Sequence, residues 1–111
     1  MAQVGDRLDL VLGALANRHR REIARELALQ PQSISRLAAH RGLSLPAIHK
    51  HIGVMENAGL VQRRKRGRTT FLVLGREPFV ELQAWIGEFH LWWGSDAASL
   101  ENYERYLTTE P

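Results

Sequence analysis

The side chains best suited to do chemistry in this sequence are cations gathered in one short stretch. Five of the six residues from 63 to 68 are positively charged, namely Arg63, Arg64, Lys65, Arg66 and Arg68. A smaller basic group, His49, Lys50 and His51, precedes them. Arginine and lysine bind phosphate oxygens, and polar side chains such as histidine exchange hydrogen bonds with base edges. The two groups together therefore predict contact with a nucleic acid.

Charge is distributed unevenly along the chain. Residues 1–75 hold 13 Lys and Arg against five Asp and Glu, a balance of +8, whereas residues 76–111 hold two against seven, a balance of −5. The net charge of +3 hides this division. Chance clustering of charges on solvated faces is the alternative. A basic body with an acidic end instead indicates a polyanionic partner for the first 75 residues.

The basic group at residues 49–51 lies on a predicted helix over residues 44–58. Ser44 is a suitable N-cap, Pro46 fits the first turn because that turn needs no N–H donor, and Gly59 can end the helix. The buried stripe would consist of Ile48, Ile52 and Met55. The positions predicted to meet DNA are then Ser44, Leu45, Pro46, Ala47, His49, Lys50 and His51.

This segment has the character of a recognition helix, whose N-terminal residues contact base edges in a major groove. His49 could exchange a hydrogen bond with a base edge, and Leu45 or Ala47 could touch a thymine methyl group. Lys50 and His51 are better suited to phosphates, which fix register and give salt dependence rather than sequence preference. An ordinary amphipathic surface helix is the alternative for this segment taken alone.

The cations at residues 63–68 lie on a predicted β-ribbon. Residues 60–74 change from helical spacing to the alternation of strands, and Gly67 can take the positive φ that a tight turn needs. The Arg66-Gly67 pair is therefore predicted at the tip. Alternation places cations on both faces, so two or three would face a phosphate backbone, and Arg66 or Arg68 could enter a minor groove. A nuclear-localisation patch or a merely solvated turn is the alternative.

The remaining elements frame these two. Apolar residues at 8, 11, 12 and 15 predict a first helix over about residues 6–16, and Asn17 and Ser33 are suitable N-caps for a second and a third. Gly42 and Leu43 form the short turn of a helix-turn-helix. Two further helices are predicted within residues 77–107. The fold class is mainly α with a small β-hairpin: a winged helix-turn-helix in a single domain, with helices 1–4, the wing, and helices 5–6.

Several classes of protein are disfavoured. The chain has no cysteine, which excludes disulfides and thiolate metal sites. Neither a signal peptide nor an apolar run long enough to span a membrane is present, so a cytoplasmic protein without a membrane partner is expected. His19 and His40 are solitary in the sequence, and His49 and His51 are about 200° apart on a helix. We therefore predict no metal, no cofactor and no catalytic site.

Three segments together resemble the ArsR-type winged-helix repressors of bacteria. Residues 15–23, LANRHRREI, resemble the opening motif of that family, at an arginine-rich turn between two helices. Residues 35–38 followed by 42–52, GLSLPAIHKHI, are similar to its helix-turn-helix. Residues 55–61, MENAGLV, resemble the start of its wing. The resemblance covers roughly residues 8–93, and the motifs are specific in combination, whereas each alone is weak.

The resemblance implies a homodimer on a palindromic DNA operator. The DNA-reading part would be about residues 17–75, and dimerisation helices would be about 6–16 and 77–107. A small core cannot absorb all the large aromatics of the fifth helix, which also favours their burial in a dimer; packing within one chain is the alternative. The predicted interface residues are Leu8, Val11, Leu12, Trp85, Phe89, Trp92, Trp93 and Tyr103.

The sequence departs from the metal-sensing members of this family. Ser33 and Ser35 stand where those members have a Cys-x-Cys pair, and hydroxyls are poor ligands for soft metals. The fifth helix carries only His90 as a histidine, so a second family site is not matched either. The chain instead resembles a cysteine-free branch. A small apolar effector, unidentified, could bind near the aromatics of the dimer.

Two functions remain after these steps. The first is a sequence-specific transcriptional regulator, a dimeric repressor that inserts the helix at 44–58 into the major groove. The second is a winged-helix module that binds proteins and has no sequence-specific DNA binding. Binding of random duplex DNA at low salt would distinguish them, because a basic wing that is incidental would give none.

Overall fold

The computed structural model describes residues 4–93 and 96–109 of the 111-residue chain. The helices are α1 (Val4–Leu15), α2 (Arg18–Leu29), α3 (Ile34–Arg41), α4 (Leu45–Asn57), α5 (Glu77–Trp93) and α6 (Asp96–Thr109). The strands are β1 (Gln32–Ser33), β2 (Val61–Arg66) and β3 (Thr69–Leu74). This order confirms the predicted winged helix-turn-helix, with one strand added before α3.

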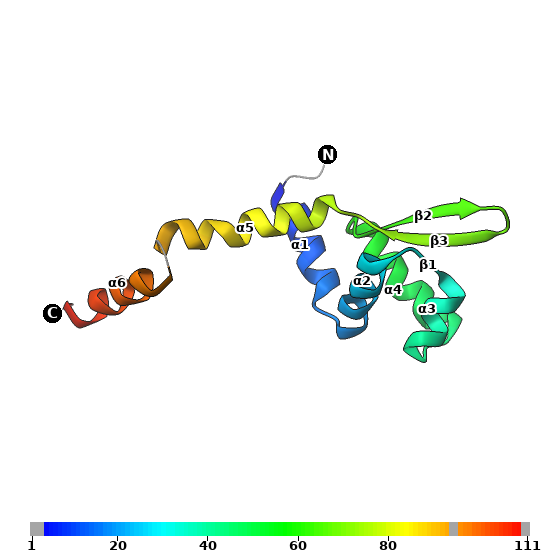
Figure 1. The fold of residues 1–111 in the computed structure, drawn as a ribbon, viewed down its shortest axis with the longest axis horizontal. Helices are drawn as coiled ribbons and strands as arrows, with labels where there is room; N and C mark the ends of the chain where they lie inside the picture. The colour runs from blue at the N-terminus through cyan, green and yellow to red at the C-terminus, as the bar shows by residue number, and fades with distance from the viewer. Residues whose placement is uncertain (1–3, 94–95, 110–111) are drawn as a thin grey trace. The chain divides into compact units, whose positions relative to one another are not determined.

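The chain divides into two units, which we describe separately. The first unit is Met1–Phe79 and holds α1 to α4 and the sheet; the second is Val80–Pro111 and holds most of α5 and all of α6. In the first unit, α2 packs on α4 and β3, α3 packs on α4, and α1 contacts α2 and α4. Figure 1 shows these four helices gathered together, with the β2–β3 hairpin extending away from them.

Polar side chains fix the starts of three helices as the sequence predicts. The side chains of Asn17, Ser33 and Ser44 accept hydrogen bonds from the backbone N–H groups three residues later, at 3.2, 3.3 and 3.2 Å. Each bond satisfies a donor that a helix leaves unpaired in its first turn. These caps decide where α2, α3 and α4 begin, and therefore which residues of α4 point outward.

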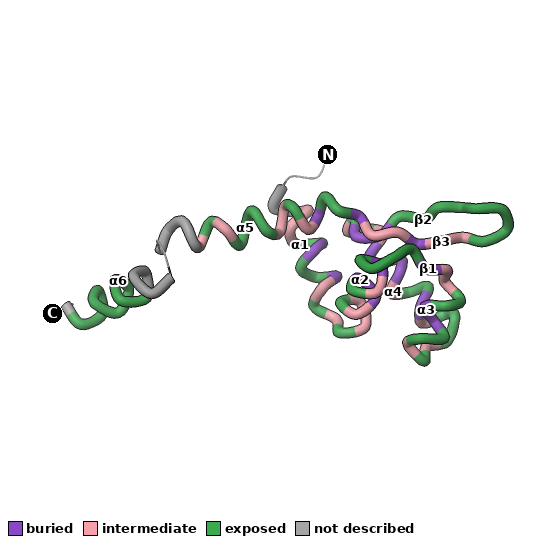
Figure 2. Tube along the Cα trace, in the orientation of Figure 1, coloured by how far each residue is buried: buried purple, intermediate pink, exposed green. Residues whose placement is uncertain are grey.

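The core of the first unit is built from the apolar stripes of α2, α3 and α4 and from one face of the sheet. Seven large side chains are almost fully buried: Ile23, Leu37, Ile48, Ile52, Met55, Leu60 and Leu72. Figure 2 shows buried segments along these helices and an exposed far end of the hairpin. The predicted inner stripe of α4 is confirmed, so its opposite face is free to contact a partner.

The sheet has three antiparallel strands in the order β1–β3–β2. The two-residue strand β1 pairs Gln32 with Leu72 and Ser33 with Phe71. The sequence analysis expected only a hairpin, and it missed β1 because two residues are too few to show alternation. This strand anchors the start of α3 to the base of the wing.

The tip of the wing lies one residue further along than predicted. Arg66 pairs with Thr69, so the two turn residues are Gly67 and Arg68 rather than Arg66 and Gly67. Gly67 has φ +63°, and no non-glycine residue in the described part of the chain has a positive φ. A positive φ at the first turn position is the pattern of a type II′ hairpin turn, which suits glycine there. As a result Arg68 stands at the tip.

The second unit consists of helical segments with exposed apolar side chains. Trp85 and Phe89 of α5 make an edge-to-face contact, with ring centroids 5.2 Å apart and planes at 83°. On α6, Leu100, Tyr103 and Leu107 are exposed. Among the described residues, no helix is long and apolar enough to cross a membrane.

Candidate nucleic-acid interface

The turn between α3 and α4 is tight and internally hydrogen-bonded. Gly42 is the C-cap of α3 with φ 63°, and the backbone N–H of Leu43 donates to the carbonyl of Ala38 at 2.9 Å. Ser44 then caps α4. Only three residues separate the two helices, so α3 holds the N-terminal turn of α4 at a fixed angle.

A hollow of about 320 Å³ brings the helix-turn-helix and the wing together. It is lined by Ser33, Ile34 and Ser35 at the start of α3, by Leu45 and His49 of α4, and by Arg68, Thr69 and Thr70 of the wing. The lining combines hydroxyls, an imidazole, a guanidinium and an exposed leucine. These groups can meet phosphate oxygens, base edges and methyl groups on one surface.

A second, larger hollow lies elsewhere on the wing. It has a volume of about 640 Å³ and is lined by Pro31, Arg64, Lys65, Arg66, Phe71 and Val73. No residue of α3 or α4 lines it. We therefore locate the candidate interface at the smaller of these two hollows, because there residues of α4 and a wing cation share a surface.

The exposed face of α4 is mostly where the sequence predicts it. Leu45 is 52% exposed, and Pro46, His49 and Lys50 are also exposed, whereas Ala47 is half-buried. Leu45 and His49 line the same hollow. These side chains stay available for contact with a partner.

His51 is directed away from that surface. It contacts two residues of α2. The Nδ1 atom of His51 lies 3.2 Å from Nη1 of Arg20, and its ring centroid lies 5.5 Å from the ring centroid of His19. Burial lowers the pKa of His51 below its usual value of 6.5, and the positive charges nearby lower it further. The imidazole is therefore engaged within the protein, although the sequence analysis assigned it to a phosphate.

The five wing cations separate into paired and unpaired groups. Arg63 forms a two-point ion pair with Glu56 of α4, at 2.9 and 3.1 Å, and this hydrogen bonding raises its pKa. Arg64 donates to Gln62 at 2.9 Å. Within the described chain, Lys65, Arg66 and Arg68 show no hydrogen bond or ion pair and are exposed. The second group is the one that stays available for a polyanion.

The strand register confirms that the cations occupy both faces of the ribbon. Arg63 and Lys65 lie opposite Leu72 and Thr70, and Arg64 and Arg66 lie opposite Phe71 and Thr69. Directly opposed residues share a face of the sheet. Since Leu72 is buried, Arg63 is on the core face, which is why it reaches α4.

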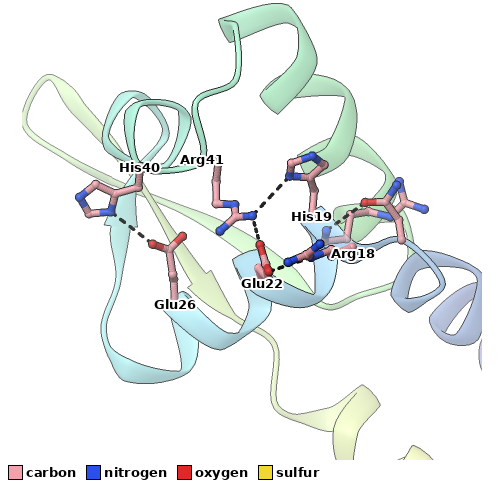
Figure 3. A network of polar contacts seen from close by, with 8 residues as sticks. Arg18, His19, Glu22, Glu26, His40 and Arg41 are labelled. Carbon is pink, nitrogen blue, oxygen red and sulfur yellow. Dashed lines mark hydrogen bonds and ion pairs between the residues drawn. The ribbon is translucent and has the colours of Figure 1, made fainter.

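A cluster that the sequence analysis missed joins α2 to α3 and α4. We call it the α2 seam: Arg18, His19, Arg20, Glu22 and Glu26 of α2, His40 and Arg41 of α3, and His51 of α4. Figure 3 shows Arg41 between Glu22 and His19, and His40 against Glu26. His19 and His40 are solitary in the sequence, but packing brings each of them against a residue of another helix. Only the density of Arg and His in residues 18–21 could have indicated it.

The predicted dimer residues fall into different environments. Leu12 is 39% exposed and Leu8 is half-buried, but Val11 is buried in the core of its own unit and offers a partner almost no surface. Leu10, which the prediction omitted, is exposed on α1. Trp85 and Tyr103 are exposed and Phe89 is half-buried. The side chains of Trp92 and Trp93 lie outside the described residues.

Two further observations concern a metal ion and a small-molecule effector in the part of the chain that is described. There, no group of three His, Asp or Glu side chains is arranged to hold a metal ion. A further hollow of about 410 Å³ is mainly apolar and is lined by Leu15, Arg21, Ala24, Arg25, Ala28, Leu74 and Phe79. Whether an effector binds near the aromatics of α5, such as Trp85, stays a prediction.

Comparison with known proteins agrees with this geometry. A family model described as a helix-turn-helix domain matches residues 15–64. The crystal structure of an ArsR family transcriptional regulator is 33% identical, with a TM-score of 0.76, and the match covers 87% of this chain and 100% of that one. The chain belongs to the ArsR family. The family is one of transcriptional regulators, not of enzymes.

Two other solved ArsR-type structures extend the comparison. An ArsR-like transcriptional regulator from Rhodococcus sp. RHA1 is 30% identical over 78% of this chain and 82% of that one, with a TM-score of 0.71. A homodimeric winged helix-turn-helix DNA-binding domain from Mycobacterium bovis shares the fold at 22% identity and a TM-score of 0.63, over 77% of this chain and 81% of that one. No curated protein is significantly similar to this chain.

Proposed function

We propose that this ArsR-family chain is a sequence-specific DNA-binding repressor that acts as a homodimer in the cytoplasm. Each subunit inserts α4 into the major groove of a palindromic operator and lays the wing on the backbone or in the minor groove. Leu45, Ala47 and His49 contact base edges, and Lys50, Lys65, Arg66 and Arg68 contact phosphates. His51 and Arg63 are left out of this set because both are engaged within the chain.

The observation that carries the proposal is the hollow shared by α3, α4 and the wing. It places Leu45 and His49 beside Arg68. Lys50 of α4 and Lys65, Arg66 and Arg68 of the wing are exposed and show no partner in the described chain. A duplex offers phosphates on both sides of a groove that carries the base edges, so one bound duplex would satisfy all of these groups. The homodimeric domain from Mycobacterium bovis, which has the same fold, supports a dimer.

Selection of binding sites from random duplexes tests the proposal. We expect enrichment of a palindrome whose half-sites are about one helical turn apart, because a two-fold dimer presents two copies of α4. Placing the selected site in front of a reporter gene should lower its expression if the protein is a repressor.

Salt dependence tests the contacts themselves. A dimer carries about eight unpaired cations in the proposed set, so log K should fall with log salt at a slope of roughly −7. No enriched sequence together with a slope near zero would favour the protein-interaction alternative.

A further inference from the structure

Arg20 of α2 connects two other helices. Its Nε donates to the carbonyl of Ala14 at 2.6 Å and its Nη2 to that of Gly13 at 3.3 Å, both in the last turn of α1. Its Nη1 lies 3.2 Å from Nδ1 of His51, in the middle of α4. One guanidinium thus joins the end of α1 to the recognition helix.

The chemistry of the pair fixes the state of the imidazole. Arginine has only donors, so Nδ1 of His51 must accept, and the ring must be neutral with its proton on Nε2. On the other side of this pair, Nδ1 of His19 lies 3.5 Å from Nη2 of Arg41. Protonation of His51 would set an N–H against an N–H and a positive charge against a positive charge.

The groups around His51 are mostly positively charged and would not stabilise a protonated imidazole ring. Arg20 and His19 face it from α2, Lys50 belongs to its own helix, and Arg41 of α3 is reached through His19. The carboxylate of Glu22 is paired with Arg41 and with Arg18. In the described part of the chain, no carboxylate contacts His51.

These contacts set the sign of a pH effect. The pKa of His51 is lowered in the folded protein, first by burial and then by Arg20, His19 and Lys50. A loosened state, in which the ring reaches water, therefore binds a proton more readily. The stabilisation from the Arg20–His51 contact is therefore fully present at a pH above about 6.5, the usual pKa of histidine. It declines as the pH falls below that value.

We propose that Arg20 and His51 form a latch that holds the recognition helix against α1 only while His51 is neutral, so that operator affinity falls when the solution is acidified. His51 is a positioning residue here and touches no DNA. The inference rests on the proposed function, since it concerns the affinity of α4 for an operator.

Operator affinity of the full chain from pH 8 to pH 5.5 tests the latch. The wild type should lose affinity steadily as the pH falls through this range, because the loosened state binds a proton more readily than the closed one. His51→Asn keeps an acceptor near the position of Nδ1 but cannot titrate, so its affinity should not show the acid loss of the wild type. His40→Asn is the matched control, because His40 pairs with Glu26 and does not contact α4 in the described structure. It should follow the wild type.

Three results would overturn the latch: a wild-type affinity that rises on acidification, an equal acid loss in His51→Asn, or an acid loss that disappears in His40→Asn. A second readout is independent of DNA. In an NMR titration, the His51 imidazole should titrate below 6.5 in the wild type and higher in Arg20→Gln, provided that both are folded by circular dichroism. An unchanged His51 titration in Arg20→Gln also overturns the latch. Failure to bind any duplex at pH 8 would refute the proposed function instead, and the NMR titration would then decide the latch alone.

Discussion

The wing and the α2 seam are both basic regions of the first unit, and they differ in whether their cations have partners within the chain. In the seam, Arg18 and Arg41 are paired with Glu22, and Arg20 is held by carbonyls and an imidazole. In the wing, Lys65, Arg66 and Arg68 have no such partner in the described chain. The difference teaches that the role of an arginine follows from its partner, not from the local charge: Arg20 and Arg41 join α2 to other helices, whereas Arg66 and Arg68 remain available for a ligand.

The largest effect is expected from removing unpaired cations of the wing, which tests directly whether they bind DNA. The double substitution Arg66→Ala and Arg68→Ala deletes four proposed phosphate contacts from a dimer, so the salt slope should change from roughly −7 to −4. Affinity at 0.1 M salt should fall by about 10³-fold. The measurement is a titration of the selected operator at several salt concentrations.

The matched control removes the same charge from α2. Arg18 and Arg25 are exposed and lie outside the proposed interface, so their double substitution by Ala should leave the slope nearly unchanged. An equal loss in both double variants would mean that net charge, and not the wing, governs affinity.

Removing a paired cation should act on stability instead. Arg41 is half-buried and joins α3 to Glu22 and His19, so Arg41→Ala should lower the free energy of unfolding by about 2 kcal/mol. Urea unfolding measures this, and Arg25→Ala should stay within about 0.5 kcal/mol of the wild type. A wild-type stability for Arg41→Ala would show that the seam holds nothing together.

A smaller effect concerns base preference on α4. His49→Ala should reduce discrimination at one base pair of each half-site by about 1 kcal/mol, because a hydrogen bond to a base edge is lost. Repeating the binding-site selection with this variant measures the change. If the preferred sequence were unaltered, His49 would contact the DNA backbone and not a base edge.

The smallest expected effect concerns Arg63, the wing cation whose partner lies within the chain. Arg63 is paired with Glu56, so Arg63→Ala should cost less than about 1 kcal/mol of stability and should not change the salt slope. A double-mutant cycle with Glu56→Gln should reveal a coupling of about 0.5 kcal/mol. If Arg63→Ala instead made the slope of log K against log salt less steep by roughly 2, Arg63 would be a phosphate contact, because a dimer carries two copies of it.

Much of the fold could be predicted because its signals are local. The caps Asn17, Ser33 and Ser44 act on residues three positions away, and the buried stripe of α4 follows from helical spacing. The wing was recognisable from its alternation and Gly67. By contrast, β1 has two residues, and its pairing with β3 reaches across about 40 positions, so no local pattern could indicate it.

The candidate site was predicted less completely than the fold. Leu45, His49 and Lys50 lie on an exposed face because the opposite face of α4 is apolar, which spacing alone reveals. Spacing could not separate Arg63 from Arg66, since both are arginines on one strand. Nor could it show that His51 turns to α2, because its partner Arg20 lies 31 residues away.

The sequence by itself determined the helix caps, the buried faces, the change to a β-ribbon and the concentration of cations in the first 75 residues, since each depends on neighbours along the chain. Only the tertiary structure decided which of those cations are used internally. Glu56 comes within reach of Arg63, and Arg20 of His51, when helices and sheet pack around the common core. Long flexible side chains have many partners available in an unfolded chain, and only packing selects one.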